Sequence, residues 1–250
     1  MNDASKELEP ELNPPERELP PEASAHIRSY VIRAGRMTDA QRRALEELGP
    51  SRMIPYRRER LEPASFFTRH KPVVMEIGFG MGKATWQIAM SRPEYDYLCL
   101  EVHSPGVGKL LLELKAHDIE NVRIIQHDAV EVLADMMPPE CLAGFHIFYP
   151  DPWPKKRHHK RRLMRKAIVD LMIDRLRPGG YLYFVTDIEE YGLAVLELLS
   201  ACPALRNEYA GFAPRIGWRP ETKFEAKATK AARGAFELYF TKRPDGSFEK

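Results

Sequence analysis

The strongest constraint on the fold is an alternation of strand and helix patterns that begins at Val73 and runs to about residue 199. Short apolar segments, expected as strands, lie at Val73–Gly78, Tyr95–Val102, Val122–His127, Phe145–Tyr149 and Tyr181–Thr186. Between and after them, helical patterns cover Lys83–Met90, Gly108–His117, Ala129–Met136, Arg162–Leu176 and Tyr191–Leu199. Strands separated by helices predict a parallel sheet with helices on both faces.

The two ends of this alternating region have different patterns. Before it, Ala44, Leu45 and Leu48 are the apolar positions of a short expected helix that Gly49-Pro50 should stop. After it, Ala235–Thr241 alternates as a strand with no helix behind it, which suits an antiparallel hairpin at the sheet edge. The expected fold is therefore α/β, a doubly wound and mostly parallel sheet with an antiparallel C-terminal hairpin.

The first 25 residues differ from the rest of the chain. They contain five prolines and seven acids against two bases, with few large apolar side chains. Such a segment buries too little surface to offset its ordering entropy, so we expect 1–25 to be a disordered acidic leader. We expect 26–250 to form one domain, in which 26–70 is an arginine-rich extension and 71–250 is the core.

Charge and composition narrow the function. The net charge is +2, but the leader carries −5, so residues 26–250 carry +7, which suits a polyanionic partner. No apolar run is long enough to span a membrane, and we expect no membrane association. The three isolated cysteines and the histidine spacing fit a reducing cytoplasm and predict no metal site. No obligate protein partner is inferred.

The first strand runs into a glycine-rich turn, Glu76-Ile-Gly78-Phe-Gly80-Met-Gly82. Glycines let the backbone approach a ligand, and the helix that follows offers free N–H groups, although a plain tight turn is the alternative. The dinucleotide fingerprint needs a glycine at position 83, where this chain has Lys83. The turn is instead similar to motif I of class I S-adenosylmethionine methyltransferases.

Acidic residues at successive strand ends support a cationic ligand. Glu101 ends the second strand, where a carboxylate can accept hydrogen bonds from ribose hydroxyls, and Asp128 ends the third. Together with Glu76 they form a negative rim that repels a pyrophosphate and attracts a sulfonium with its α-amino group. Solvated acids without a ligand are the alternative.

The segment after the fourth strand is the most unusual. It reads Pro-Asp151-Pro-Trp153-Pro followed by a cationic run, and residues 152–166 hold eight Lys/Arg and no acid. A solvated surface is the alternative, but densely packed like charges are better explained by phosphate binding. The expected RNA phosphate contacts are Arg157, His158, His159, Lys160, Arg161 and Arg162. Trp153 is expected either to stack on the target base or to pack in the core.

This segment resembles the hallmark of the bacterial tRNA (guanine-N7)-methyltransferases. Arg28-Ser-Tyr-Val-Ile-Arg-Ala-Gly-Arg-Met-Thr and Arg219-Pro-Glu-Thr222-Lys-Phe-Glu225 resemble two further blocks of that family, and the resemblance covers about residues 27–243. It implies a seven-stranded Rossmann-like methyltransferase sheet and S-adenosyl-L-methionine as cofactor, released as S-adenosyl-L-homocysteine. It also implies tRNA as substrate, with 7-methylguanosine formed at position 46 of the variable loop.

The resemblance also assigns roles to individual residues. Asp151 matches the catalytic position. The cofactor-binding positions it implies, with the glycine turn included, are Glu76, Gly78, Gly80, Gly82, Glu101, Asp128 and Asp151. The substrate-contacting positions it implies are Lys155, Asp187, Thr222, Lys223, Phe224 and Glu225.

Three other functions fit parts of the sequence. A methyltransferase for exocyclic amines usually carries [DN]-P-P-[YF] after the fourth strand, which differs from Asp151-Pro-Trp-Pro at its third position. An RNA-binding protein without catalysis would not need the acidic rim and the glycine turn. A hydride-transferring dehydrogenase conflicts with the glycine spacing.

Overall fold

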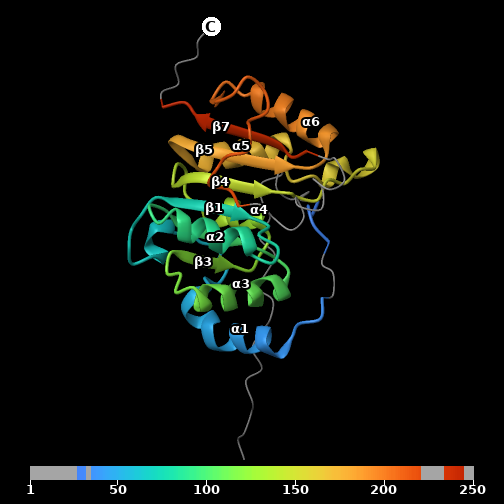
Figure 1. The fold of residues 1–250 in the computed structure, drawn as a ribbon. Coiled ribbons are helices and arrows are strands. Elements are labelled where there is room, and N and C mark those ends of the chain that lie inside the picture. Colours follow the sequence, from blue (N-terminus) through green and yellow to red (C-terminus); the bar gives the residue numbers. More distant parts are fainter. Residues whose placement is uncertain (1–26, 32–34, 221–233, 245–250) are drawn as a thin grey trace, which may run out of the picture.

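A seven-stranded sheet forms the centre of the computed structural model, which describes residues 27–31, 35–220 and 234–244 (Figure 1). The strand order is β3-β2-β1-β4-β5-β7-β6. The strands are β1 (Val73–Ile77), β2 (Asp96–Leu100), β3 (Val122–Ile125), β4 (Leu142–Phe148), β5 (Leu176–Thr186), β6 (Leu205–Asn207) and β7 (Phe236–Lys242). Strands β1 to β5 pair in parallel, and β7 is antiparallel to both β5 and β6. The mostly parallel sheet with antiparallel strands at its C-terminal edge is confirmed.

The helices are α1 (Asp39–Arg52), α2 (Lys83–Ser91), α3 (Ser104–Ala116), α4 (Ala129–Asp135), α5 (Lys166–Arg175) and α6 (Glu189–Ser200), with 3₁₀ turns η1 (Pro63–Phe66) and η2 (Lys156–Arg161). Four of the helices, α2 to α5, connect the parallel strands, while α1 precedes β1 and α6 follows β5. Within the described ranges, no helix is long and apolar enough to cross a membrane.

Two separate cores show that the sheet is covered on both faces. Alternate residues of a strand enter different cores, because successive side chains of a strand point to opposite faces. Val74 of β1 packs with apolar residues of α1, α2 and α3, whereas Met75 packs with those of α4, α5 and α6. Helix α1 lies beside α3 near the β3 edge, where the Gln41 amide donates to the Pro105 carbonyl at 3.0 Å (Figure 1). The doubly wound arrangement is confirmed.

The order of the strands reverses between β1 and β4, which are neighbours in the sheet. The chain leaves β1 toward β2 and β3 on one side, and leaves β4 toward β5 on the other. Such a switch point opens a crevice beyond the carboxyl ends of the two strands. The glycine turn follows β1 and the Asp151 segment follows β4, so both reach this crevice.

Several expected element boundaries were wrong, for local physical reasons. Helix α1 continues through Gly49-Pro50 to Arg52, since a proline in the last turn removes only one hydrogen bond. Helix α5 begins at Lys166 rather than at Arg162, and Arg162 and Leu163 are buried in the turn before it. Strand β6 was missed because three residues are too short to show an alternating pattern.

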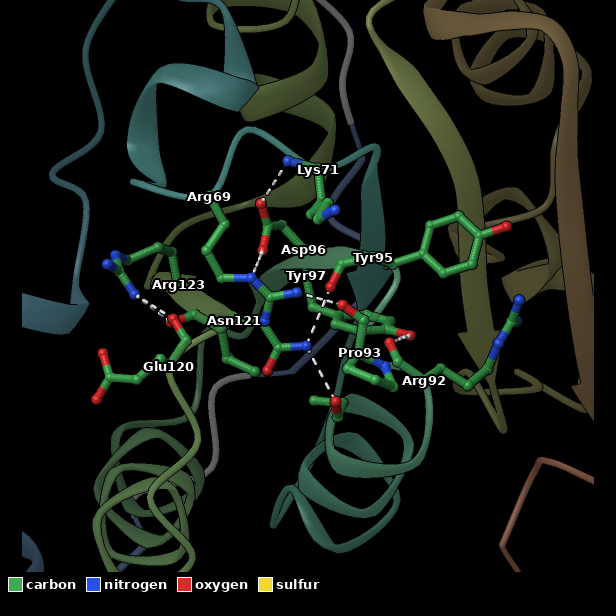
Figure 2. Close-up of polar contacts among 12 residues, drawn as sticks. Arg69, Lys71, Arg92, Pro93, Tyr95, Asp96, Tyr97, Glu120, Asn121 and Arg123 are labelled. Carbon is green, nitrogen blue, oxygen red and sulfur yellow. Dashed lines mark hydrogen bonds and ion pairs between the residues drawn. The ribbon is translucent and has the colours of Figure 1, made fainter.

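A polar network braces the opposite edge of the sheet, at the amino ends of β1, β2 and β3 (Figure 2). Buried Asp96 accepts the Lys71 N–H at 3.0 Å and lies 3.8 Å from the Arg69 guanidinium. The Asn121 amide donates to the carbonyls of Ala89 and Tyr95 at 2.9 and 3.0 Å. These bonds join the loops that precede β1, β2 and β3, and so hold the amino ends of the three strands in register.

Candidate active site

The glycine turn leaves β1 in a conformation that favours glycine. Gly78, Gly80 and Gly82 have φ values of 77°, 58° and 72°, and Gly82 is the N-cap of α2. A Cβ on Gly80 would meet no atom within 4 Å, so the turn faces open space there. On its other side the turn packs tightly against α3. Gly106 of α3 is so close that a Cβ there would lie 2.1 Å from the Gly80 carbonyl oxygen. The turn is thus rigid on its protein side and open on its ligand side.

Two acids lie where the neighbouring strands end, as expected. The Glu101 carboxylate follows β2 and accepts the N–H groups of Gly80, Val102 and His103 at 2.8, 2.7 and 3.0 Å. Asp128 is the N-cap of α4, is buried, and accepts the Val130 N–H at 2.7 Å. Both carboxylates are oriented by backbone donors, so their positions are set before a ligand binds.

Glu76 is placed differently from the other acids. It lies within β1, is only 3% exposed, and does not line the cavity described below. Burial raises the pKa of Glu76 to about 7, with a smaller contribution from the negative charge of Glu101, while the polar side chains of Thr85 and Cys99 oppose the rise. Because this carboxyl is half protonated near neutral pH, the charge beside the glycine turn changes with pH in that range.

Replacing Glu76 with glutamine is expected to remove a pH dependence of stability. The folded pKa is raised, so between pH 4.5 and about 7 the folded protein keeps a proton that the unfolded chain releases. The free energy of unfolding of the wild type therefore falls as pH rises through this window. Relative to the wild type, Glu76→Gln should gain about 2–3 kcal/mol between pH 5 and pH 8 in urea unfolding without cofactor. Glu47→Gln, on the exposed side of α1, is the control. A constant difference across this range would contradict a raised pKa.

The turn after β4 has an unusual backbone on both sides of Asp151. Tyr149 and Trp153 are non-glycine residues with φ values of 52° and 44°, and they flank Pro150-Asp151-Pro152. Such conformations cost free energy and persist where the surrounding structure requires them, often at functional sites. The exposed carboxyl of Asp151 lines the cavity. The predicted catalytic residue is thus at the switch point.

Of the two places expected for Trp153, the hydrophobic core is wrong, and stacking on the target base stays a prediction. It belongs to neither hydrophobic core, and its indole N–H donates to the Ser29 carbonyl at 3.0 Å. The Arg161 guanidinium lies 4.8 Å from the centre of its ring, and the His158 ring meets its edge. Trp153 therefore ties the Asp151 segment to the basic turn and to the N-terminal segment.

The basic run forms the 3₁₀ turn η2, and none of the turn's residues is buried. Lys155, Lys156, Arg157 and Lys160 are exposed. Desolvation, followed by the charges of nearby cations, lowers the pKa of His158, so the positive charge comes mainly from lysine and arginine. This surface, residues 155–161, is called the basic turn below.

Arg162 does not fit its expected role as a phosphate contact. It is 5% exposed, and its guanidinium binds both carboxylate oxygens of Glu190 and the Pro152 carbonyl. To reach a phosphate, this buried guanidinium would have to give up its bonds to the Pro152 carbonyl and to the exposed Glu190 carboxylate. Arg162 is therefore a structural residue that fastens the basic turn to α6, and the expectation is revised.

The glycine turn, Glu101 and Asp151 share one cavity of about 450 Å³. Its apolar wall contains Ile77, Leu100, Ala129 and Leu163. Among the lining residues that were not predicted as site residues are Ser29, Tyr30, Val31, His103 and His127. Ser29, Tyr30 and Val31 belong to the N-terminal block that resembles the family, but no pattern within that block distinguishes them, and the histidines have no local pattern. The His127 ring stacks on Tyr56 at 3.7 Å.

The remaining expected site residues lie elsewhere. Asp187 follows β5 and is half-buried, but it is not among the cavity-lining residues. Thr222, Lys223, Phe224 and Glu225 lie outside the described residues, as does the leader 1–25. Among the residues that are described, no group of three or more His, Cys, Asp or Glu side chains is arranged to hold a metal ion.

The fold and the site together define a class I, Rossmann-like S-adenosylmethionine methyltransferase. A family model described as "Putative methyltransferase" matches residues 70–238. Over 217 residues the chain is 50% identical to the tRNA (guanine-N(7)-)-methyltransferase of Nitrosospira multiformis, covering 87% of this chain and 95% of that protein. Over 241 residues it is 48% identical to the protein of that name from Paraburkholderia xenovorans, covering 95% and 93%. The chain belongs to the tRNA (guanine-N(7)-)-methyltransferase family.

Similarity to solved structures is more distant. An rRNA methylase from Streptococcus thermophilus has a TM-score of 0.48 and 16% sequence identity, with 69% of this chain and 87% of that chain covered.

Proposed function

We propose that this chain transfers a methyl group from S-adenosyl-L-methionine to N7 of a guanine in tRNA, at position 46 of the variable loop. The observation that carries the proposal is one cavity that joins the glycine turn, Glu101 and Asp151, with the basic turn attached to its rim through Trp153. Two family members with about half of their residues in common with this chain carry the name of this activity.

The cavity fits the cofactor in size and chemistry. A volume of about 450 Å³ lies within the range of about 300–1,000 Å³ typical of small-molecule sites. The open side of Gly80 admits a ligand close to the backbone, and the Glu101 carboxylate suits a ribose. Asp151 and Glu101 on the walls, together with buried Asp128 at the start of α4, favour a cationic ligand. S-adenosylmethionine supplies an electrophilic methyl group on sulfur.

The residues of the chain then act on the purine by position and charge. Guanine N7 has an in-plane lone pair and no proton, so the N–C bond forms as the S–C bond breaks and no general base is required. The chain must hold the nitrogen in line with the methyl carbon. Positive charge arrives on the purine during the transfer, and the Asp151 carboxylate stabilises it. The backbone conformations at Tyr149 and Trp153 keep this carboxylate oriented into the cavity.

The basic turn supplies phosphate contacts, which position the RNA, whereas the pocket selects the base. We infer that Lys155, Lys156, Arg157, Lys160 and Arg161 contact phosphates, with His158 and His159 beside them. Arg162 holds the turn in place through Glu190. Asp187 and Thr222–Glu225 remain predicted substrate contacts.

Neutralising two lysines of the basic turn is expected to weaken the salt dependence of tRNA binding. Removing one phosphate contact should reduce the log–log salt slope by roughly 0.7–0.9, so Lys156→Gln with Lys160→Gln should reduce it by about 1.4–1.8. The matched control replaces Lys71 and Lys115, which are exposed; Lys71 precedes β1, and Lys115 lies in the last turn of α3. Filter binding over a range of salt concentrations measures both. An unchanged slope in the first variant would show that the turn is only a solvated surface.

The direct test of the function is incubation of the purified chain with labelled S-adenosylmethionine and unmodified tRNA. Methyl incorporation, followed by chemical strand cleavage at N7-methylguanosine, should give one fragment that ends at position 46. Incorporation without cleavage would indicate a different methylated atom, and cleavage elsewhere would correct the position. No incorporation into any tRNA would overturn the proposal.

A further inference from the structure

A segment of the N-terminal extension closes one side of the cofactor cavity. Ser29, Tyr30 and Val31 line this cavity together with Gly80 and Asp151, although they are far from both in sequence. Val31 is an apolar residue that stays 50% exposed at this position. Residues 29–31 are called the strap below.

The strap is held at two points on different sides of the cavity. On one side, the Trp153 indole N–H donates to the Ser29 carbonyl at 3.0 Å. On the other, the Tyr30 hydroxyl hydrogen-bonds to Asp128 at the start of α4. Burial, followed by the negative charge of Asp128, raises the pKa of Tyr30, which fits a hydroxyl that stays protonated and donates to the carboxylate. The strap thus spans from the α4 end of the cavity to the turn that carries Asp151.

The chemistry of the wall indicates what the strap faces. Leu100, Ala129 and the His127 ring form an apolar and aromatic region near Asp128, whereas Asp151 lies on the β4 side. A flat purine suits the first region, because aromatic rings bind a base by stacking and a tyrosine adds a polar group at its edge. Positive charge suits the second region.

We propose that Tyr30 is a cofactor-binding residue, which packs on the adenosine half of S-adenosylmethionine, and that Trp153 is a positioning residue that holds the strap over it. This inference rests on the proposed function and names a further part of the same site. It also explains why Trp153 contacts both Ser29 and Arg161 of the basic turn. Cofactor binding and RNA binding are then linked through one side chain.

Calorimetric titration of the full chain with S-adenosylhomocysteine tests the role of Tyr30. Loss of a stacked ring should raise Kd about 5- to 100-fold in Tyr30→Ala, and loss of the hydroxyl alone should raise it only a few-fold in Tyr30→Phe. The salt slope of tRNA binding should stay unchanged in both. Tyr209→Ala, an exposed tyrosine in the loop after β6, is the matched control.

Trp153→Phe tests the positioning role, since it keeps an aromatic ring and removes the bond to Ser29. It should raise Kd for S-adenosylhomocysteine, and in combination with Tyr30→Ala it should add little further loss, because both changes release the same strap. Additive losses would show that Trp153 does not act through the strap.

The outcomes separate this inference from the proposed function. A Kd within twofold of the wild type in Tyr30→Ala would overturn the inference while leaving the methyltransferase activity intact. If Tyr30→Ala lowers Tm, the test passes to Tyr30→Phe. A raised Kd in the well-folded Tyr30→Phe supports the inference. An unchanged Kd in Tyr30→Phe, together with a normal KM for S-adenosylmethionine in Tyr30→Ala, overturns it. A wild-type chain that binds no S-adenosylhomocysteine would overturn both.

Discussion

Replacing Asp151 with alanine is expected to lower the turnover of tRNA methylation by about 10²–10³, the scale seen when one preorganised electrostatic group is removed. The carboxylate lines the cavity, and its backbone is constrained by two prolines and by the positive φ values of Tyr149 and Trp153. Its removal leaves the charge that arrives on the purine without this stabilising partner. Single-turnover kinetics on saturating tRNA measure the effect.

Binding of tRNA should change little in the same variant. Phosphate contacts dominate the affinity for RNA, and a nearby acid opposes rather than supports it. Asp151→Asn is the sharper comparison, because it keeps the shape and the hydrogen-bond acceptance but removes the charge. A large loss of rate in the asparagine variant favours electrostatic stabilisation, and near-normal activity favours positioning alone. If both variants turn over like the wild type, Asp187 or Glu225 becomes the leading candidate.

Replacing Gly80 with valine is expected to raise the Kd for S-adenosylhomocysteine by more than about 100-fold. Gly80 has a φ of 58°, which a β-branched residue adopts only with strain of order 1–3 kcal/mol. A valine side chain would also occupy the open space on the ligand side of the turn, since nothing in the protein lies within 4 Å of that Cβ position. The reduced volume acts on the bound state, whereas the strain is present with or without ligand and raises Kd by displacing the turn from its ligand-binding conformation.

Gly217→Val is the matched control for this substitution. Gly217 is exposed and lies outside the cavity, a Cβ there also meets no atom within 4 Å, and its φ is not in the left-handed range. Calorimetry of both variants separates the effect of a valine in general from its effect at this turn. Wild-type affinity in Gly80→Val would show that the turn does not hold the cofactor.

Local patterns in the sequence predicted most of the sheet and the centre of the site. The five parallel strands were found because buried strands are short continuous apolar runs between helical periods, which is a local signal. Gly80 and Asp151 were found because each belongs to a short motif, and the switch-point rule brought the two motifs together. The sequence alone therefore determined the fold class, the position of the cavity and the residue expected to act on the base.

Only the tertiary structure decided how individual side chains are used. Arg162 and Lys160 look alike in the basic run, yet Arg162 is buried against Glu190 while Lys160 is exposed. Glu76 and Glu101 both belong to the acidic rim, but burial raises the pKa of Glu76 and removes it from the cavity wall. The physical reason is that burial, pairing and pKa depend on neighbours distant in sequence, as with Ser29 and Trp153, which are 124 residues apart and joined by one hydrogen bond.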